Sequence, residues 1–581
     1  MKWTAFLCFW LITGCGCGES NDSGASGGTA SGGSAGSTGG SGASGGSTSG
    51  GAGGATGGSA GGGGASGTAG GGGTSGSDAG DGPIDTTPPT ISLGASKNLV
   101  TQAESILLTA TASDDVGVVD VVFYEGTTVL GTDATTAYEQ SVAYTYANNG
   151  THTYKAVARD QAGNTAEATV EVGVAIDATN SVWKKQFNGT PTSTDFARMV
   201  TLDAQGRPIV LTHTSQGVED AFRWAANGNF DSHMYGTGTT TPSIYMFGVA
   251  TNAAGDIAIS GAWDGCSCSD MVHTLLLITK DAPNLNWNKT LGLSQSSNKE
   301  FGYATTVAPN GDIYVCGSTL GTMSGQGPAP FSNAGKTDAF LFKVSQGALV
   351  WARQWGTASD ELCTKLTLDS QGRIWSAGYI ETGAALAGQT SAGARDAWLK
   401  VFDADGNALF TTQFGTTLDD APGGVAALAS GAVVVAGSGG PLPGAVTSTG
   451  DTLGTTDGWL RYYDATFQVT KTLMLGTPGS DAANGVAANA KGDVWVVGRT
   501  AGSLGTSAGA FDAYARRYGA GDAPIYTRQF GTAGDETLAS CAVDAAGNLF
   551  AVGSTSGSLF ASLEGATDGI LVSLGPLGNW R

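Results

Sequence analysis

Histidine is scarce in this chain of 581 residues, and charged side chains are few. There are four His, and Asp, Glu, Lys and Arg together make up 13% of the chain, against about a quarter in an ordinary globular protein. Histidine is the usual general base of enzymes, and none of the four belongs to a Ser-His-Asp, metalloprotease or phosphate-loop motif. The sequence therefore predicts a protein that is not an enzyme.

Positive charge is in short supply. Lys and Arg number 27 while Asp and Glu number 49, which gives a net charge of -22. Nucleic acids and anionic membrane surfaces attract basic proteins, so this balance argues against both as partners. Cations or basic surfaces fit the charge better.

Cysteine is rare and irregularly spaced. Of the eight Cys, Cys8 and Cys15 lie near the N-terminus, and the spacing of the others does not indicate a disulfide framework. The "CSC" at 266 to 268 has no partners at metal-ligand spacing, so a loop bridge or free thiols are favoured over a metal site. The sequence leaves open the disulfide state of Cys266, Cys268, Cys316, Cys363 and Cys541.

The apolar run near the N-terminus is too short to cross a bilayer. It extends from Trp3 to Ile12 and reads as an export signal. The following "LITGC" resembles the bacterial lipobox, in which the Cys becomes the lipid-modified first residue. This resemblance implies a signal peptide over residues 1–14, lipidation of Cys15, and a place in the cell envelope, at the outer membrane or cell surface. An ordinary secretory signal cut nearby is the alternative.

Glycine, in contrast, is abundant, with 95 residues. Much of it lies in residues 15–84, which are mainly Gly, Ser and Ala and offer almost no apolar side chains to offset chain entropy. The every-third-residue glycine pattern of collagen is missing there. We expect a disordered tether between the lipidated Cys and the folded part of the chain.

Residues 85–175 change to short alternating strand patterns, such as "SILLTATA" and "VVDVVFYEG". About seven such strands in a hundred residues are typical of an immunoglobulin-like β-sandwich. The segments "DTTPPTISL" and "ARDQAGNTA" resemble bacterial Ig-like modules, which implies the same fold here.

Acidic and amide side chains gather in the predicted loops of this sandwich. If the strands follow the Ig order, these loops lie at one end, where carboxylate and amide oxygens suit Ca²⁺. Tight turns alone also favour Asp and Asn, and that simpler interpretation stays open. The candidate calcium ligands are Asp85, Asp114, Asp115, Asp160 and Asn164.

A turn that ends in Gly and is followed by apolar residues recurs seven times after residue 180, at intervals of about 49 to 61 residues. The turn glycines are Gly206, Gly255, Gly311, Gly372, Gly431, Gly492 and Gly547. Each period accommodates four short strands, A to D, with one long loop between strands B and C. The segment "DAFLFKVSQGALVWARQWGT", from Asp338, and its later versions contain strands C and D.

Four-stranded sheets repeated around an axis form a β-propeller. The repeats resemble bacterial propeller repeats of the SBBP type, which implies a seven-bladed propeller over residues 180–581. The overall expectation is an all-β chain: a disordered Gly/Ser-rich linker, an Ig-like β-sandwich and this propeller. The region opens with "WKKQF", a strand D without its strand C, so this segment is predicted to complete the last sheet.

An acid stands eleven residues before the turn glycine in six of the seven repeats; Asp195, for example, precedes Gly206. Ile244 takes this place in the second repeat. We expect the acids on the crossing from strand D to strand A or at the first residue of strand A. There they would either bind backbone N–H groups between sheets or form an acidic funnel for a cation or basic ligand. These candidates are Asp195, Glu300, Glu361, Asp420, Asp481 and Glu536.

These features favour a lipid-anchored envelope protein whose propeller is a non-enzymatic binding module and whose Ig-like domain is a spacer. Its ligand would be a protein or a carbohydrate, with no nucleic acid partner and no cofactor apart from calcium. Propellers also include lyases and hydrolases, and a purely structural envelope protein is a third interpretation.

Overall fold

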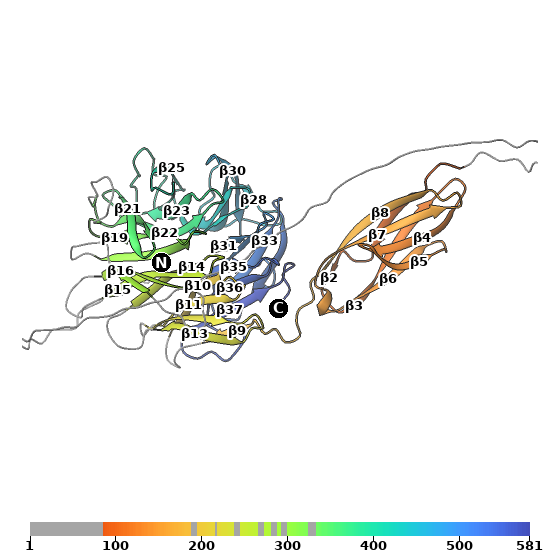
Figure 1. Cartoon of the computed structure of the whole chain (residues 1–581), viewed down its shortest axis with the longest axis horizontal. Helices are drawn as coiled ribbons and strands as arrows, with labels where there is room; N and C mark the ends of the chain where they lie inside the picture. The colour runs from red at the N-terminus through yellow and green to blue at the C-terminus, as the bar shows by residue number, and fades with distance from the viewer. Residues whose placement is uncertain are drawn as a thin grey trace, which may run out of the picture. The chain divides into compact units, whose positions relative to one another are not determined.

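The structure, a computed structural model, describes residues 85–187, 194–214, 218–236, 244–264, 272–280, 288–291, 299–323 and 333–581. Strands dominate these residues, so the predicted all-β class is confirmed (Figure 1). None of the described helices is both long and apolar enough to cross a membrane. The predicted signal peptide, Cys15, the tether, Cys266 and Cys268 lie outside the described residues.

The first domain is an Ig-like sandwich of two sheets, drawn in orange in Figure 1. One sheet has the order β1 (Thr90–Ala95), β3 (Glu104–Ser113), β6 (Tyr138–Tyr144). The other has the order β2 (Leu99–Val100), β8 (Thr165–Val174), β7 (Gly150–Asp160), β4 (Val118–Glu125), β5 (Thr128–Asp133). A 3-10 turn, Tyr146–Asn148, precedes β7.

Alternating side chains of this sandwich point inward, as the period of two requires. Ile106, Leu108, Phe123 and Tyr154 are among the buried residues of its core. The hydroxyls of Tyr144 and Tyr154 are 2.6 Å apart and hydrogen-bonded, so two polar groups in an apolar core are satisfied. Burial raises the pKa of both tyrosines.

Seven further sheets share one strand order among the described residues of the second region, yellow to blue in Figure 1. The first three are β10 (Asp195–Leu202), β11 (Pro208–Thr214), β12 (Glu219–Trp224), β13 (Phe230–Gly236); β14 (Ile244–Thr251), β15 (Asp256–Asp264), β16 (Val272–Lys280), β17 (Asn288–Leu291); and β18 (Glu300–Val307), β19 (Ile313–Thr319), β20 (Asp338–Ser345), β21 (Ala348–Trp355).

The fourth to sixth sheets are β22 (Glu361–Leu368), β23 (Ile374–Ile380), β24 (Asp396–Phe402), β25 (Ala408–Phe414); β26 (Ala421–Ala427), β27 (Val433–Gly439), β29 (Asp457–Tyr463), β30 (Val469–Leu475); and β31 (Asp481–Ala488), β32 (Val494–Thr500), β33 (Asp512–Tyr518), β34 (Pro524–Phe530). The fifth sheet gains an edge strand, β28 (Val446–Thr447), which pairs in parallel with β30. We call the four strands of each sheet A to D in this order.

The seventh sheet is completed from the other end of the region. Its strands are β35 (Glu536–Val543), β36 (Leu549–Thr555), β37 (Asp568–Leu574) and β9 (Lys185–Phe187). Gln186 of β9 lies opposite Ile570 of β37. The predicted pairing of "WKKQF" with the last strand is therefore confirmed.

The predicted tight turns between strands A and B are also confirmed. Their glycines, from Gly206 to Gly547, have φ between +73° and +89°. Only glycine enters this left-handed region at little cost, which explains why a Gly ends every one of these turns. The turns keep the hairpins of successive sheets in the same register.

The core of this region lies between successive sheets. Strand B is buried on both faces in β19, β23 and β36, as expected for a sheet covered on each side. Each strand A contacts strand A of the next sheet, and β35 contacts β10. An apolar cluster that includes Val200, Val210, Phe550 and Leu571 joins the seventh sheet to the first.

One disulfide lies among the described residues. It joins Cys316 in β19 to Cys363 in β22, with the Cα atoms 5.6 Å apart, and so links the third sheet to the fourth. The irregular cysteine spacing did not indicate it. Cys541, in β35, is a free, half-buried thiol, and burial raises its pKa to about 12, so it is neutral and poorly reactive.

Candidate functional site

The six predicted acids all lie at the start of strand A and are all buried. Asp195, Glu300, Glu361, Asp481 and Glu536 are the first residues of their strands, and Asp420 immediately precedes β26. None is more than 3% exposed. A ligand on an open acidic funnel would not reach carboxylates at this depth.

The Thr that ends the repeated "GT" binds four of these acids, Glu361, Asp420, Asp481 and Glu536. In the fourth sheet the backbone N–H of Thr357 donates to Glu361 Oε2 at 2.9 Å, and its hydroxyl donates to Oε1. In the next sheet Thr416 donates both its N–H and its hydroxyl to Asp420 Oδ2, at 2.6 and 2.8 Å. These bonds tie the end of strand D to the start of the following strand A.

The Gln of the same segment holds a second acid. Gln354 Nε2 donates to Oδ2 of Asp338, the first residue of β20, at 2.8 Å. Gln413 binds Asp396 in the same way at 2.8 Å, and Gln529 binds Asp512 at 2.7 Å. These Asp residues start strand C and are at most 1% exposed.

The glycine between Gln and Thr lets the two acids face each other. A Cβ on Gly356 would lie 2.1 Å from Asp338 Oδ1 and 2.7 Å from Glu361 Oε2, so no larger residue fits. We call such a set, formed by an acid of strand C, the Gly and the acid of the next strand A, an acid junction. The four junctions are Asp338/Gly356/Glu361, Asp396/Gly415/Asp420, Asp457/Gly476/Asp481 and Asp512/Gly531/Glu536.

Burial disfavours the charged form of these carboxyls. It raises the pKa of Asp338, Glu361 and Asp481. Burial, followed by the nearby charge of Asp396, raises the pKa of Asp420 to about 6. For Asp457 burial is again the main cause, with Asp481 adding to it, and its pKa is also about 6.

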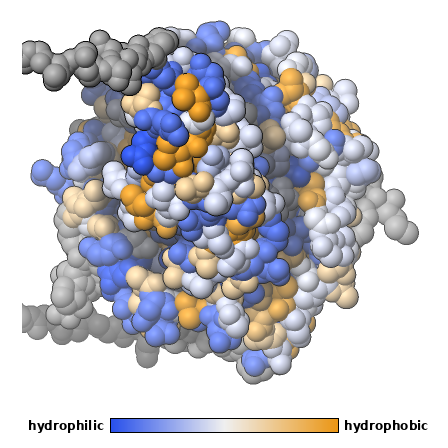
Figure 2. All heavy atoms as spheres, turned by 90° about the vertical axis from the view of Figure 1, so that its right-hand side faces the viewer, coloured by the Kyte–Doolittle hydropathy of each residue, from blue (hydrophilic) through white to orange (hydrophobic). Residues whose placement is uncertain are grey.

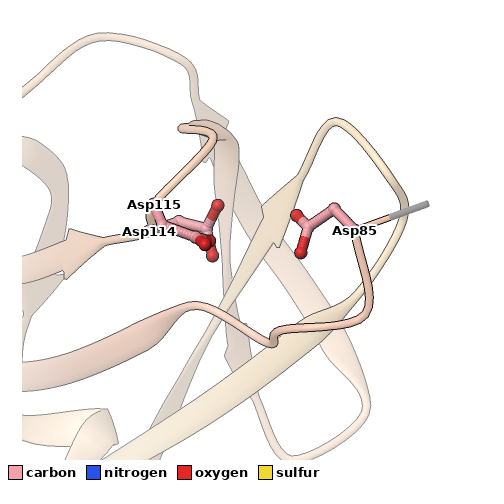
Figure 3. Close-up of side chains that lie close together, drawn as sticks. All are labelled: Asp85, Asp114 and Asp115. Carbon is pink, nitrogen blue, oxygen red and sulfur yellow. The ribbon is translucent and has the colours of Figure 1, made fainter. Parts of the chain in front are cut away.

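In the Ig-like domain, three of the predicted calcium ligands come together. Oxygens of Asp85, which precedes β1, and of Asp114 and Asp115, which follow β3, all lie within 4.8 Å of one another. Figure 3 shows the Asp85 carboxylate facing the other two. Asp85 Oδ2 and Asp114 Oδ1 are buried and have no hydrogen-bond partner among the described residues.

The other two predicted ligands are engaged with each other. Asn164 donates its backbone N–H to Asp160 Oδ1 at 2.9 Å and its amide to Oδ2 at 2.8 Å. Burial raises the pKa of Asp160, but these hydrogen bonds outweigh it and leave the pKa below its usual value. The same amide lies 3.2 Å from the carbonyl oxygen of Asp85 and so positions that residue.

A polar pocket of about 240 Å³ opens between the fifth and sixth sheets. Its walls come from the loop after β28, the end of β30, the loop after β32 and strands β33 and β34. Hydroxyl side chains dominate it: the lining residues are Thr449, Gly450, Asp451, Thr452, Gly476, Thr477, Pro478, Ser503, Leu504, Arg516, Pro524 and Thr527.

A buried ion pair forms part of the pocket wall. Arg516 donates from Nη1 to Asp451 Oδ2 at 2.5 Å and from Nη2 to Oδ1 at 2.7 Å, and Gly476 N–H also donates to Oδ2. Both side chains are 3% exposed. Burial alone would lower the pKa of Arg516, but its bonds to Asp451 raise it, so the pair is charged and internally neutral.

Comparison of the repeats explains why this pair occurs once. The residue that corresponds to Arg516 is Lys400 in the fourth sheet, where its Nζ lies 5.1 Å from the ring centroid of Trp355. It is Arg461 in the fifth, over Phe414 at 4.5 Å. Before the sixth sheet the aromatic position holds Leu475. Without a ring, the cation instead binds a carboxylate from the loop after β28.

Comparison with known proteins identifies one domain. A family model described as a bacterial Ig domain matches residues 89–156, and no curated protein matches the chain. Residues 89–156 therefore form a bacterial Ig domain. Domains of this kind are typical of surface or extracellular proteins.

Solved structures give weaker similarities. The fibronectin(III)-like modules of CbhA from Clostridium thermocellum are 24% identical, with 15% of this chain and 94% of that chain covered and a TM-score of 0.14. A protein of unknown function from Dyadobacter fermentans is 11% identical over 57% and 95%, with a TM-score of 0.32. Carbohydrate-binding modules of a β-sandwich superfamily are 15% identical over 36% and 87%, with a TM-score of 0.16. These values assign no function.

Proposed function

We propose that this protein is a lipid-anchored component of the bacterial cell envelope, at the outer membrane or cell surface, and that residues 180–581 form a seven-bladed β-propeller. The support is the shared strand order of the seven sheets and the apolar cluster between the last and the first. The Ig-like domain, residues 85–175, acts as a spacer on the tether of residues 15–84.

The anchor rests on the lipobox-like "LITGC". Lipidation of Cys15 after removal of residues 1–14 would hold the chain at the membrane. Labelling with a fatty-acid analogue in the native cells tests this: the wild-type protein should be labelled and the Cys15→Ser variant should not. Mass spectrometry that finds an unmodified N-terminus at another residue would refute the anchor.

The propeller binds a small, uncharged, polar ligand and has no catalytic role. The observation that carries this proposal is the pocket between the fifth and sixth sheets. Asp451 is paired with both Nη atoms of Arg516, so the pocket has neither an unpaired guanidinium for an anion nor an unpaired carboxylate for a cation. Among the described residues, the hydroxyls of Thr449, Thr452 and Thr527 have no hydrogen-bond partner and remain for a ligand.

The volume and the lining of the pocket restrict the class of ligand that it can bind. The volume is below the roughly 300 to 1,000 Å³ of sites for drug-sized molecules, so it suits a single ring. Pro478, Leu504 and Pro524 add apolar surface beside the hydroxyls. A neutral sugar unit presents both kinds of surface, so a carbohydrate is favoured over a protein ligand.

Saturation-transfer NMR with neutral methyl glycosides of common hexoses and N-acetylhexosamines tests the ligand class. We expect at least one glycoside to bind, and Thr452→Val and Thr527→Val each to weaken it about tenfold, the effect of one lost hydrogen bond. Thr417→Val is the matched control, because Thr417 is exposed beside a neighbouring acid junction. No binding, or equal binding by all variants, would remove this pocket as the site and favour a structural protein or an enzyme.

A calcium ion in the Ig-like domain is a second proposal. The free oxygens of Asp85 and Asp114, with Asp115 beside them, supply hard oxygen ligands on two loops. Binding there would fasten the segment before β1 to the loop after β3 and so stiffen the spacer.

A further inference from the structure

Each of the four acid junctions contains a buried carboxylate oxygen without a partner among the described residues. Among the described residues, Oδ1 of Asp338, Asp396 and Asp512 accepts no hydrogen bond, whereas Oδ2 of each is bound by a Gln. The free oxygen points toward the glycine that separates it from the next acid. In the middle junction a Cβ on Gly415 would lie 2.4 Å from Asp396 Oδ1 and 3.1 Å from Asp420 Oδ2.

Within the part of the chain that the structure describes, no salt bridge balances these carboxylates. Among the described residues, Asp396 and Asp420 form no ion pair, and both are fully buried. The charged residues next to these acids in the sequence make other contacts: Arg395 binds Glu381 at 2.6 Å, and Asp419 accepts the N–H of Arg395. Near the first junction Lys336 pairs with Asp360, and near the last Arg499 interacts with Asp535.

Two ionised carboxylates in such a place repel each other and lack water to screen them. One proton removes this repulsion, because a protonated oxygen can donate to the carboxylate opposite. It also gives the free Oδ1 the hydrogen bond that a buried polar atom requires. A proton needs no cavity, which fits the close approach around the glycine.

We propose that the acid junctions Asp338/Glu361 and Asp396/Asp420 are proton-binding sites, each of which takes up one proton in mildly acidic solution and shares it between two neighbouring sheets. Protonation of a junction thus strengthens the contact between two neighbouring sheets. Asp457/Asp481 differs in detail, because there Oδ1 of Asp457 accepts Gly454 N–H and Oδ2 is the oxygen without a partner.

The direction of the pH effect follows from the raised pKa values of Asp338, Glu361 and Asp420. The folded protein binds the proton more tightly than the unfolded chain. Proton binding therefore adds most to the free energy of unfolding when the pH is below the pKa of the unfolded chain, about 3.9 for Asp. This added stability is lost as the pH rises through about 6, the pKa of Asp420 in the folded protein. Protonation of ordinary surface acids lowers the free energy of unfolding instead. To separate the two effects, each variant is compared with the wild type at pH 5 and at pH 8.

Asp396→Asn in the full chain mimics the protonated state. Its amide oxygen can still accept from Gln413, while its Nδ2 donates to Asp420 at every pH. We expect the thermal unfolding midpoint of the sheets to rise by at least about 2 °C at pH 8 and to be unchanged or lower at pH 5. Asp403→Asn is the matched control: Asp403 is a turn acid of the same sheet whose pKa is lowered, so this change should lower the midpoint at both pH values.

An equal fall for Asp396→Asn at both pH values would overturn the proposal, since the pair would then be ionised throughout. Loss of wild-type stability on chelation, abolished in the variant, would identify a metal site instead and also overturn it. If Asp396→Asn does not fold, infrared spectra of the wild type and Asp338→Asn decide. A buried carboxylic acid band that fades between pH 5 and 8 and weakens in the variant supports the proposal, and its absence refutes it.

Discussion

The ring of Trp183 meets the ring of Phe550 edge to face, with the centroids 5.0 Å apart. Trp183 precedes β9, and Phe550 belongs to β36, so the two ends of the repeat region pack together in the seventh sheet. Trp183 is 2% exposed, which makes it a principal apolar contact of that sheet.

Trp183→Ala should therefore destabilise the seventh sheet by about 3 to 5 kcal/mol. Loss of β9 would also uncover the edge of β37, which favours aggregation. Denaturant unfolding and light scattering measure the two effects. Val182→Ala is the control. The Val182 side chain, next to Trp183 in the sequence, is 46% exposed, so its loss should change stability and aggregation little. Equal behaviour of the two variants would show that the seventh sheet is held by other contacts.

Gly415→Ala should cost about 1 to 3 kcal/mol, as overpacking of a core does. Its new methyl group would collide with the carboxyls of Asp396 and Asp420. Gly521→Ala is a suitable comparison, because a Cβ there meets nothing within 4 Å and surface changes of this kind stay within about 0.5 kcal/mol. Chemical denaturation would decide, and a neutral Gly415→Ala would contradict the close contact.

The disulfide between Cys316 and Cys363 should stabilise the third and fourth sheets. It closes a loop with a sequence separation of 47, and removal of such a link typically costs about 2 to 4 kcal/mol. The double variant Cys316→Ser/Cys363→Ser should melt earlier than the wild type under oxidising conditions. A reductant should lower the melting temperature of the wild type and leave that of the double variant unchanged; no effect on the wild type would argue against the bond.

Calcium should raise the melting temperature of the Ig-like domain. A concentration ten times the Kd would add about 1.4 kcal/mol. Asp115→Asn should weaken this response, because Asp115 belongs to the three-carboxylate cluster. Glu139→Gln, an exposed acid on β6 of the same domain, should leave it intact. Identical calcium responses in all three proteins, or none in the wild type, would exclude the site.

The features that the sequence predicted correctly are those that recur from repeat to repeat. The turn glycines, the start of strand A at the acids and the pairing of β9 recur or follow from a missing strand, so comparison of copies reveals them. The same comparison identified Glu361 and its counterparts but left two roles open. It could not show that each faces an Asp from strand C of the preceding sheet, because that contact depends on how two sheets pack.

Features that occur once were not predictable. Asp451 lies in a loop of Gly, Thr and Ser with no counterpart in the other repeats, so nothing in the sequence pairs it with Arg516. Cys316 and Cys363 lie on different strands, and their contact depends on the packing of β19 against β22. One sequence feature indicates the ion pair weakly: Leu475 stands where the corresponding residues of earlier repeats, Trp355 and Phe414, are aromatic.

The hydropathy of the exposed surface does not indicate a further binding site. On the face drawn in Figure 2, hydrophobic and hydrophilic residues are interspersed. Single exposed apolar residues such as Leu99, Val129 and Ile525 are ordinary for a folded protein. The pocket and the acid junctions, both between sheets, are therefore the features that distinguish this chain.

The short strand β9 also determines how the repeat region would respond to mechanical load. Any pull transmitted along the chain from its N-terminal side first loads Asp177, which binds Arg528 of β34 and the N–H of Trp580. It then loads β9, which pairs with β37 at three positions. The side chain of Gln186 adds a bond to Asp568 and accepts N–H groups from the loop before it, at Leu559 and Phe560. These contacts would carry the load together, and their release would precede the unravelling of any other sheet.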